Sequence, residues 1–103
     1  MKFLVVSVAA LLSTAASAET HQYRVLFGGD DVGGLEVETA GNTSNIEFDY
    51  KQNGRGPTIT EKVEVDAEGI PTNWTITGRT TFGNPVNESY ACTDGKASWQ
   101  DST

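Results

Sequence analysis

The sequence predicts an all-β protein: an antiparallel up-and-down meander of six or seven strands, forming a curved sheet or partial barrel and preceded by a signal peptide. Short runs alternate apolar and polar residues, which is the period-2 pattern of half-buried strands. Clusters of Gly, Asn, Asp and Pro separate the runs, and no helical period of useful length follows the N-terminal apolar stretch. The short connections favour antiparallel neighbours.

The first three predicted strands show this alternation most clearly. In "NIEFDYK", Ile46, Phe48 and Tyr50 fall on one face, and the charged residues between them fall on the other. The same rule places Val25 and Phe27 together. These strands are "QYRVLF" (residues 22–27), "GLEVET" (34–39) and "NIEFDYK" (45–51).

The later predicted strands repeat the pattern with more β-branched and aromatic residues, which fit a pleated surface. Ile59, Val63 and Val65 share one face of the fourth strand, and Trp74 and Ile76 share one face of the fifth. These strands are "TITEKVEVD" (58–66), "NWTITG" (73–78), "VNESYAC" (86–92) and "KASWQ" (96–100).

Turn chemistry accounts for the segments between the strands. "NGRGP" (residues 53–57) lies between two alternating runs, so we predict a hairpin corner in which Gly54 and Gly56 are available for positive φ. Arg55 would then be exposed at its tip. The remaining predicted turns are "GGDDVGG" (28–34), "AGNTSN" (40–45), "DAEGIP" (66–71), "GNP" (83–85) and "TDG" (93–95).

Residues 1–18 have the pattern of a secretory signal. Lys2 precedes the apolar stretch "FLVVSVAALL", and the small residues Ala16 to Ala18 suit a cleavage site. A membrane anchor is the alternative, but a spanning helix needs about 20 apolar residues. We therefore expect a periplasmic or secreted protein whose mature part, residues 19–103, is one antiparallel β-domain.

The charge of the chain limits its partners. Seven basic residues stand against fourteen acidic ones, a formal net charge of −7. Such a surface repels phosphate backbones, so nucleic acid and anionic membranes are not expected partners, and no membrane association is expected after signal cleavage. The simpler meaning of the charge is solubility.

Residues for catalysis or metal binding are sparse. His21 and Cys92 are the only histidine and cysteine, so neither a three-ligand metal site nor a nucleophilic triad has its usual residues. We assign no catalytic, cofactor or metal residue and expect no cofactor in this chain. Cys92 could pair with another chain, be a reactive thiol, or be a small buried hydrophobe.

Two acidic sets remain, and both are interpreted as solvated. Asp30 and Asp31 lie in a glycine-rich predicted turn without the spacing of a calcium loop. The second set lies around a strand end and the following turn, where we expect an exposed face. It consists of Glu61, Glu64, Asp66 and Glu68.

Three segments carry a resemblance to a known family: residues 23–39, residues 49–78 with "GRGPT" and "GIPTNWTITG", and residues 95–103 with "GKASW". Together they resemble the leading β-domain of exported bacterial amidohydrolases related to imidazolonepropionase. The resemblance implies a metal-dependent catalytic domain following the β-domain. That family's catalytic residues belong to the later domain, and none has a matching position here.

The sequence thus favours a non-catalytic N-terminal β-module of an amidohydrolase-like exported protein, with the parent rather than this chain as the enzyme. Its role would be to pack on the catalytic domain or to shape access to it. The apolar face could instead meet a second copy of the sheet. The alternative is a stand-alone periplasmic binding module for an apolar ligand or a protein partner. The predicted contact residues are Arg55, Trp74, Tyr90 and Trp99.

Overall fold

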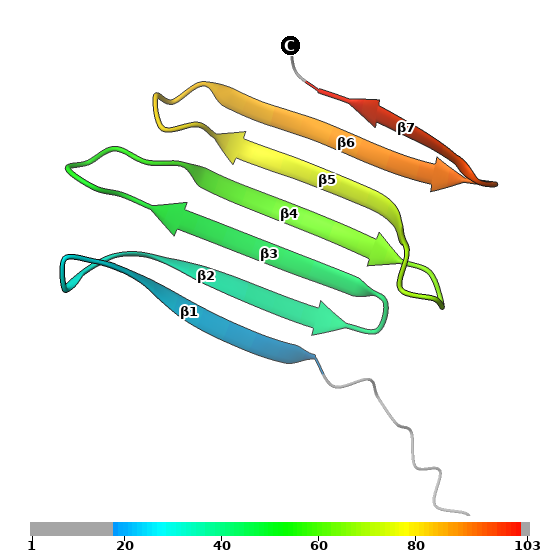
Figure 1. Cartoon of the computed structure of the whole chain (residues 1–103), viewed down its shortest axis with the longest axis horizontal. Helices are drawn as coiled ribbons and strands as arrows, with labels where there is room; N and C mark the ends of the chain where they lie inside the picture. Colours follow the sequence, from blue (N-terminus) through cyan, green and yellow to red (C-terminus); the bar gives the residue numbers. More distant parts are fainter. Residues whose placement is uncertain (1–17, 102–103) are drawn as a thin grey trace, which may run out of the picture.

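The computed structural model describes residues 18–101, and its strands form one antiparallel sheet (Figure 1). The signal peptide expected at residues 1–18 lies, except for Ala18, outside the described residues. The strands are β1 (Glu19–Phe27), β2 (Asp30–Ala40), β3 (Thr43–Tyr50), β4 (Thr58–Val65), β5 (Pro71–Arg79), β6 (Pro85–Thr93) and β7 (Lys96–Gln100).

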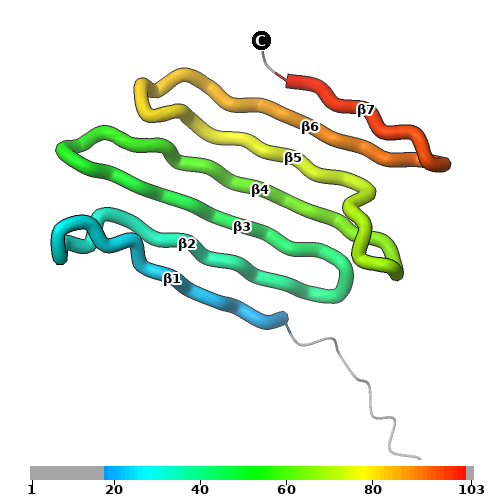
Figure 2. The backbone as a smooth tube through the Cα atoms, in the orientation of Figure 1, coloured from blue at the N-terminus to red at the C-terminus, as the bar shows by residue number. Residues whose placement is uncertain are grey.

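The strands lie side by side in chain order, from β1 at one edge to β7 at the other (Figure 2). This confirms the predicted up-and-down meander and fixes the strand number at seven. β1 and β7 do not pair with each other, so the sheet is open rather than closed. Across residues 18–101, no helix is long and apolar enough to cross a membrane.

The pairing register sorts the side chains onto two faces. Residues directly opposite each other in neighbouring strands share a face, and one such row runs from Tyr23 through Leu35 and Phe48 to Ile59. We call the side of this row the apolar face and the other side the polar face. The apolar face carries Tyr23, Val25, Leu35, Val37, Ile46, Phe48, Tyr50, Ile59, Val63, Trp74, Ile76, Val86, Tyr90 and Trp99.

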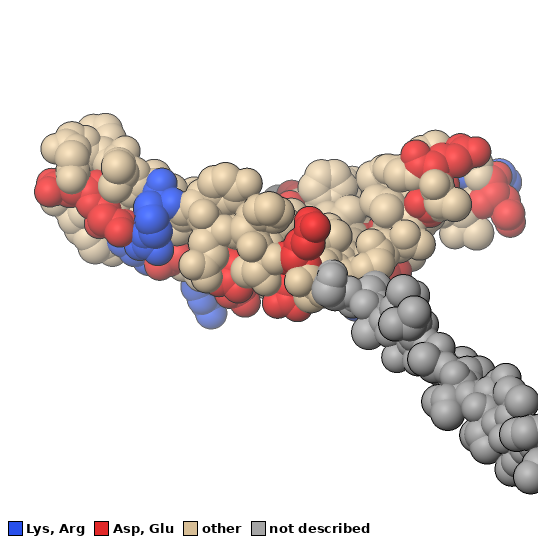
Figure 3. Space-filling view, turned by 90° about the horizontal axis from the view of Figure 1, so that it is seen from below, with Lys and Arg blue, Asp and Glu red and all other residues tan. Residues whose placement is uncertain are grey.

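The molecule is a single layer, so its apolar side chains are not enclosed. Gly56 is the one buried residue within the described range 18–101, and the apolar residues of the central strands are half-buried. In the view along the β1 edge, acidic side chains line the lower side of the middle of the layer, and uncharged ones line the upper side (Figure 3). A sheet normally buries its apolar face against a second layer, and these residues supply no such layer.

One expectation about the first hairpin was wrong. The predicted turn at residues 28–34 is much shorter, because β2 already begins at Asp30 and only Gly28 and Gly29 separate the two strands. The register also shifts between Val25 and Leu26, because β2 has one extra residue, Val32, at a β-bulge. β1 itself is continuous, so Val25 and Phe27 stay on one side of it, and the Phe27 side chain is exposed.

The β3–β4 corner, residues 50–58, confirms the predicted hairpin. Asn53 and Gly54 both have positive φ, 53° and 75°, as a two-residue type I′ turn requires. Gln52 and Arg55 close the turn, since the backbone N–H of each donates to the carbonyl oxygen of the other, at 2.8 and 3.0 Å. Arg55 is exposed, as expected.

Candidate interaction face

Aromatic residues gather at one end of the apolar face, on the last three strands. Trp74 of β5 lies opposite Tyr90 of β6, which lies opposite Trp99 of β7. The Tyr90 and Trp99 rings pack with centroids 5.9 Å apart and planes tilted by 56°, a geometry that aromatic pairs favour. Trp99 nevertheless remains 51% exposed. The structure thus brings together three of the four predicted contact residues.

Arg55 does not belong to this group. It lies in the turn between β3 and β4, at the left end of the sheet in Figure 1, whereas Trp74 follows the turn at the opposite end, between β4 and β5. A single partner patch centred on the aromatic row would not include Arg55. The predicted meander could have separated them, because consecutive turns of a meander lie at opposite ends of the sheet, and Arg55 and Trp74 adjoin consecutive turns.

The aromatic row includes a polar contact with Glu61. The indole Nε1–H of Trp74 donates a hydrogen bond to Glu61 Oε1 at 3.0 Å. Both residues are half-buried, and the register places Glu61 opposite Ile76 on the apolar face. The expectation that Glu61 is part of a solvated acidic face was therefore wrong.

The other members of that acidic set have different positions. Glu64 lies on the polar face, where its Oε1 is 3.6 Å from Lys62 Nζ. Asp66 organises the β4–β5 turn, because its Oδ1 accepts hydrogen bonds from the backbone N–H groups of Glu68 and Ile70 at 2.9 and 3.0 Å. Glu68 itself is exposed in this turn. The set is not a single cluster.

Glu88 is a second carboxylate on the apolar face. It lies opposite Ile76, so Glu61, Ile76 and Glu88 form one row across β4, β5 and β6. Glu88 is half-buried between Val86 and Tyr90 along its strand. Glu88 was not singled out from the sequence, and Glu61 was assigned to a solvated set, although each occupies an apolar position in the period-2 alternation of its strand. That alternation was the signal that could have found them.

Basic side chains of the strands lie on the opposite side. Arg24, Lys62, Arg79 and Lys96 all occupy polar-face positions in the register. Apart from the tyrosines and Cys92, the ionisable residues at the regularly alternating positions of the apolar face are Glu19, His21, Glu61 and Glu88. His21 Nε2 lies 3.7 Å from Glu19 Oε2 at the β1 edge.

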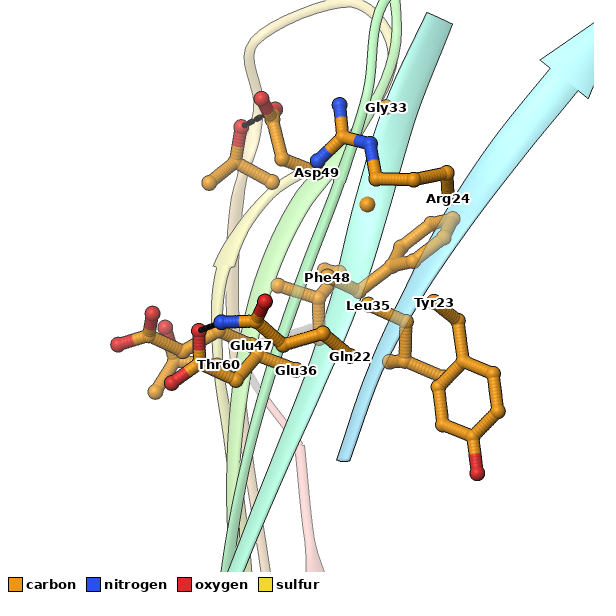
Figure 4. A pocket seen from close by; sticks show the side chains of 13 residues that line it. Gln22, Tyr23, Arg24, Gly33, Leu35, Glu36, Glu47, Phe48, Asp49 and Thr60 are labelled. Atoms are coloured by element: carbon orange, nitrogen blue, oxygen red, sulfur yellow. Dashed lines mark hydrogen bonds between the residues drawn. The ribbon is translucent and has the colours of Figure 1, made fainter. Parts of the chain in front are cut away.

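The polar face has a shallow pocket of about 590 Å³ over β1 to β4. Gln22, Glu36, Glu47 and Thr60 gather on this side of the sheet, while Tyr23 points away from the other side (Figure 4). Gln22 Nε2 donates to Glu36 Oε2 at 3.1 Å. The pocket is lined mainly by polar groups on a flat sheet.

The charged groups at the upper rim of this pocket are paired. The Arg24 guanidinium crosses over Gly34, where a Cβ would meet Nη1 at 2.6 Å, and it makes two hydrogen bonds to Asp31, at 2.9 and 2.7 Å. These bonds raise the pKa of Arg24 and lower that of Asp31. Hydrogen bonds from Lys51 and then Thr58 lower the pKa of Asp49. Asp31 thus acts in an ion pair rather than in a solvated turn.

The residues considered for catalysis are not brought together. His21 lies on β1, and Cys92 lies on β6 as a half-buried free thiol opposite Ala97. A side-chain hydrogen bond with Cys92 raises the pKa of Tyr90, and desolvation raises it further. In the described part of the chain, no three His, Cys, Asp or Glu side chains are grouped to hold a metal ion.

No protein-family model, curated protein or solved structure matches this chain. The resemblance to amidohydrolase β-domains therefore stays a prediction that rests on the sequence motifs.

Proposed function

We propose that this chain is a non-catalytic β-module of an exported, metal-dependent amidohydrolase-like protein, and that its apolar face packs on a separately folded catalytic domain. The observation that carries the proposal is the uncovered apolar face, with its aromatic row of Trp74, Tyr90 and Trp99. Exposed apolar patches of this extent mark sites of protein interaction. The identity of the partner rests on the motif resemblance alone.

The dimensions of the sheet suit a protein partner. Seven strands at about 4.8 Å spacing and about eight residues at about 3.4 Å each give a face of about 29 by 27 Å, or about 800 Å². Stable protein interfaces bury about 800 Å² on each partner. The apolar face alone is therefore large enough for a specific complex.

A small apolar ligand suits this face less well. Small-molecule sites are concave and enclose most of the ligand surface. A single-layer sheet contacts a ligand from one side only, so much of the ligand would stay in water. The geometry thus favours a protein partner over the alternative of a small-molecule binding module.

The test is a binding measurement with a defined partner. The chain is mixed with the purified catalytic domain of an exported imidazolonepropionase-related amidohydrolase that lacks its own leading β-domain, and complex formation is followed by sedimentation velocity. We expect a one-to-one complex with micromolar or tighter affinity. Ile76→Asp places a charge in the middle of the apolar face and should abolish the complex.

Thr77→Asp is the matched control, because Thr77 is the next residue of β5 and lies on the polar face. Circular dichroism checks that both variants keep the sheet, and Ile76→Thr serves as a milder variant if Ile76→Asp unfolds. Absence of a complex with the unmodified chain would contradict the proposal. So would equal losses from Ile76→Asp and Thr77→Asp.

A further inference from the structure

The Glu61–Glu88 row sets a condition on what can cover the apolar face. Glu61 Oε1 accepts one hydrogen bond, from Trp74, and the carboxylate of Glu88 makes no hydrogen bond or ion pair within residues 18–101. Both are half-buried among apolar neighbours, yet in the open sheet they still reach water. A partner that covers the face removes that water.

Burying these carboxylates is unfavourable unless the partner replaces the lost hydration. An ionised carboxylate in an apolar environment requires a paired charge and hydrogen-bond donors. The face itself has no lysine or arginine among its strand residues, since those of the strands lie on the polar face. The compensating cations must therefore come from the partner.

A second copy of the sheet does not satisfy this condition. Packing two apolar faces together would bring Glu19, Glu61 and Glu88 of both copies into one interface, with no strand lysine or arginine on either face. His21 is the one basic strand residue of the face, and it already lies beside Glu19 at the β1 edge. Like charges at an interface suppress association.

We propose that the apolar face binds a protein surface that is apolar around two arginine side chains, one directed at Glu61 and one at Glu88. This inference deepens the proposed function, on which it rests, by specifying the chemistry of the partner surface. Arginine suits the site because its planar guanidinium donates two parallel hydrogen bonds to a carboxylate and is less strongly hydrated than an ammonium group. Trp74 donates to one oxygen of Glu61, and the other oxygen accepts no hydrogen bond from residues 18–101.

The spacing of the two carboxylates gives a further requirement. β4 and β6 are separated by two strand spacings, so the Glu61 and Glu88 backbones lie about 9.6 Å apart. Two residues seven positions apart on one side of an α-helix are separated by about 10.5 Å along its axis. A helix with arginines at such positions and leucines between them would place an apolar contact over Ile76.

The test uses two amphipathic helical peptides as probes. Both have the same leucine face, and at two positions seven residues apart one has arginine and the other has citrulline, which keeps the shape and removes the charge. Binding to the whole chain is measured by tryptophan fluorescence and calorimetry at low and high salt. We expect the arginine peptide to bind about tenfold more tightly.

Variants of the chain show which carboxylates cause the difference in affinity between the two peptides. In the double variant Glu61→Gln/Glu88→Gln, the two peptides should bind with affinities within about threefold of each other, because the buried charges are gone. The matched control is Glu36→Gln/Glu47→Gln, which removes an adjacent pair of carboxylates from the polar face and should keep the tenfold difference.

Each other outcome counts against the inference in a distinguishable way. Equal binding of both peptides to the unmodified chain would overturn the arginine requirement and leave the docking face in place. A similar loss in both double variants would show a general effect of net charge instead. Failure of both peptides to bind would overturn the docking face as well. A concentration-dependent dimer whose formation Ile76→Asp prevents would assign the face to a second copy.

Discussion

The β3–β4 corner and the apolar face share two strands but hold their conformations by different means. In the corner, backbone and side-chain groups make hydrogen bonds to one another. Lys51 Nζ by itself donates to Asp49 Oδ1, Thr58 Oγ1 and the Gly56 carbonyl oxygen, at 2.8 to 2.9 Å. The apolar face has rows of half-buried side chains with no opposing layer. The polar groups of the corner find their hydrogen-bond partners within the chain, whereas the side chains of the apolar face need a partner surface for full burial.

The largest loss of stability is expected from a substitution at Gly56, the buried residue of the corner. A Cβ there would collide with the carbonyl oxygen and the ring of Tyr50, so Gly56→Ala forces the backbone apart. We expect a loss of about 3 kcal/mol in the free energy of unfolding, as for other severe steric changes. Urea denaturation followed by circular dichroism measures it.

Gly54→Ala is the control for that variant. Nothing lies within 4 Å of a Cβ at Gly54, and the cost comes only from its positive φ, at about 1 kcal/mol. If Gly54→Ala costs as much as Gly56→Ala, the close packing of the corner does not determine its stability.

The second largest loss of stability is expected from a substitution on the apolar face. Phe48 is half-buried between Leu35 and Ile59, so Phe48→Ala should cost about 1.5 kcal/mol, below the 3 to 5 kcal/mol typical of an enclosed phenylalanine (about 4 on average). Leu26→Ala, at a side chain that is 66% exposed, is the control and should cost less than about 0.5 kcal/mol.

The stability of Phe48→Ala also tests whether the apolar face is open in solution. A cost above about 3 kcal/mol for Phe48→Ala would mean that the face is enclosed in solution. Sedimentation of the same sample would then show whether a second copy encloses it.

A smaller effect is expected for Lys51→Met. The substitution keeps the aliphatic stem and removes the donor that serves the Gly56 carbonyl and the Asp49 carboxylate. We expect a loss of about 1 kcal/mol, mainly from the unsatisfied carbonyl, because exposed ion pairs contribute little. Lys62→Met is the control, since Lys62 has only a 3.6 Å ion pair with Glu64. Equal effects of the two substitutions would contradict the role assigned to Lys51.

The smallest effect is a pH dependence of stability from Asp31 and Asp49. Their hydrogen bonds lower the pKa of each carboxyl in the folded state below the ordinary value of 3.8. The stabilisation is therefore present above pH 3.8 and is lost as the pH falls through the lower folded-state pKa. Thermal unfolding at a series of acidic pH values should show this fall, and Asp31→Asn/Asp49→Asn should reduce it. An unchanged slope in the double variant would contradict this assignment.

Sequence reasoning predicted features that depend on neighbouring residues. The Asn53–Gly54 turn requires only two residues that accept positive φ between alternating runs. The strands from β3 to β7 were located for the same reason, because alternation and turn residues are both local. The degree of curling was not deducible, since the same alternation is compatible with an open curved sheet and with a partial barrel.

The errors occurred where contacts between strands outweigh local preference. Asp30 and Asp31 favour turns, yet pairing with β1 extends β2 over them, and the ion pair with Arg24 fixes Asp31. Glu61 was assigned by charge to a solvated set, although its position in the alternation places it beside Trp74. At such positions the strand register is a better guide than residue type.

The order of the strands has a consequence for how the protein folds. Every hydrogen-bonded strand pair joins neighbours in the chain, so we expect the sheet to assemble from consecutive hairpins. The entropic cost of loop closure is small in such a chain, and the stability of each strand depends mainly on its neighbours, as in repeat proteins. Amide hydrogen exchange should therefore be slowest in β4 and quicken step by step toward β1 and β7, with each edge opening independently of the other.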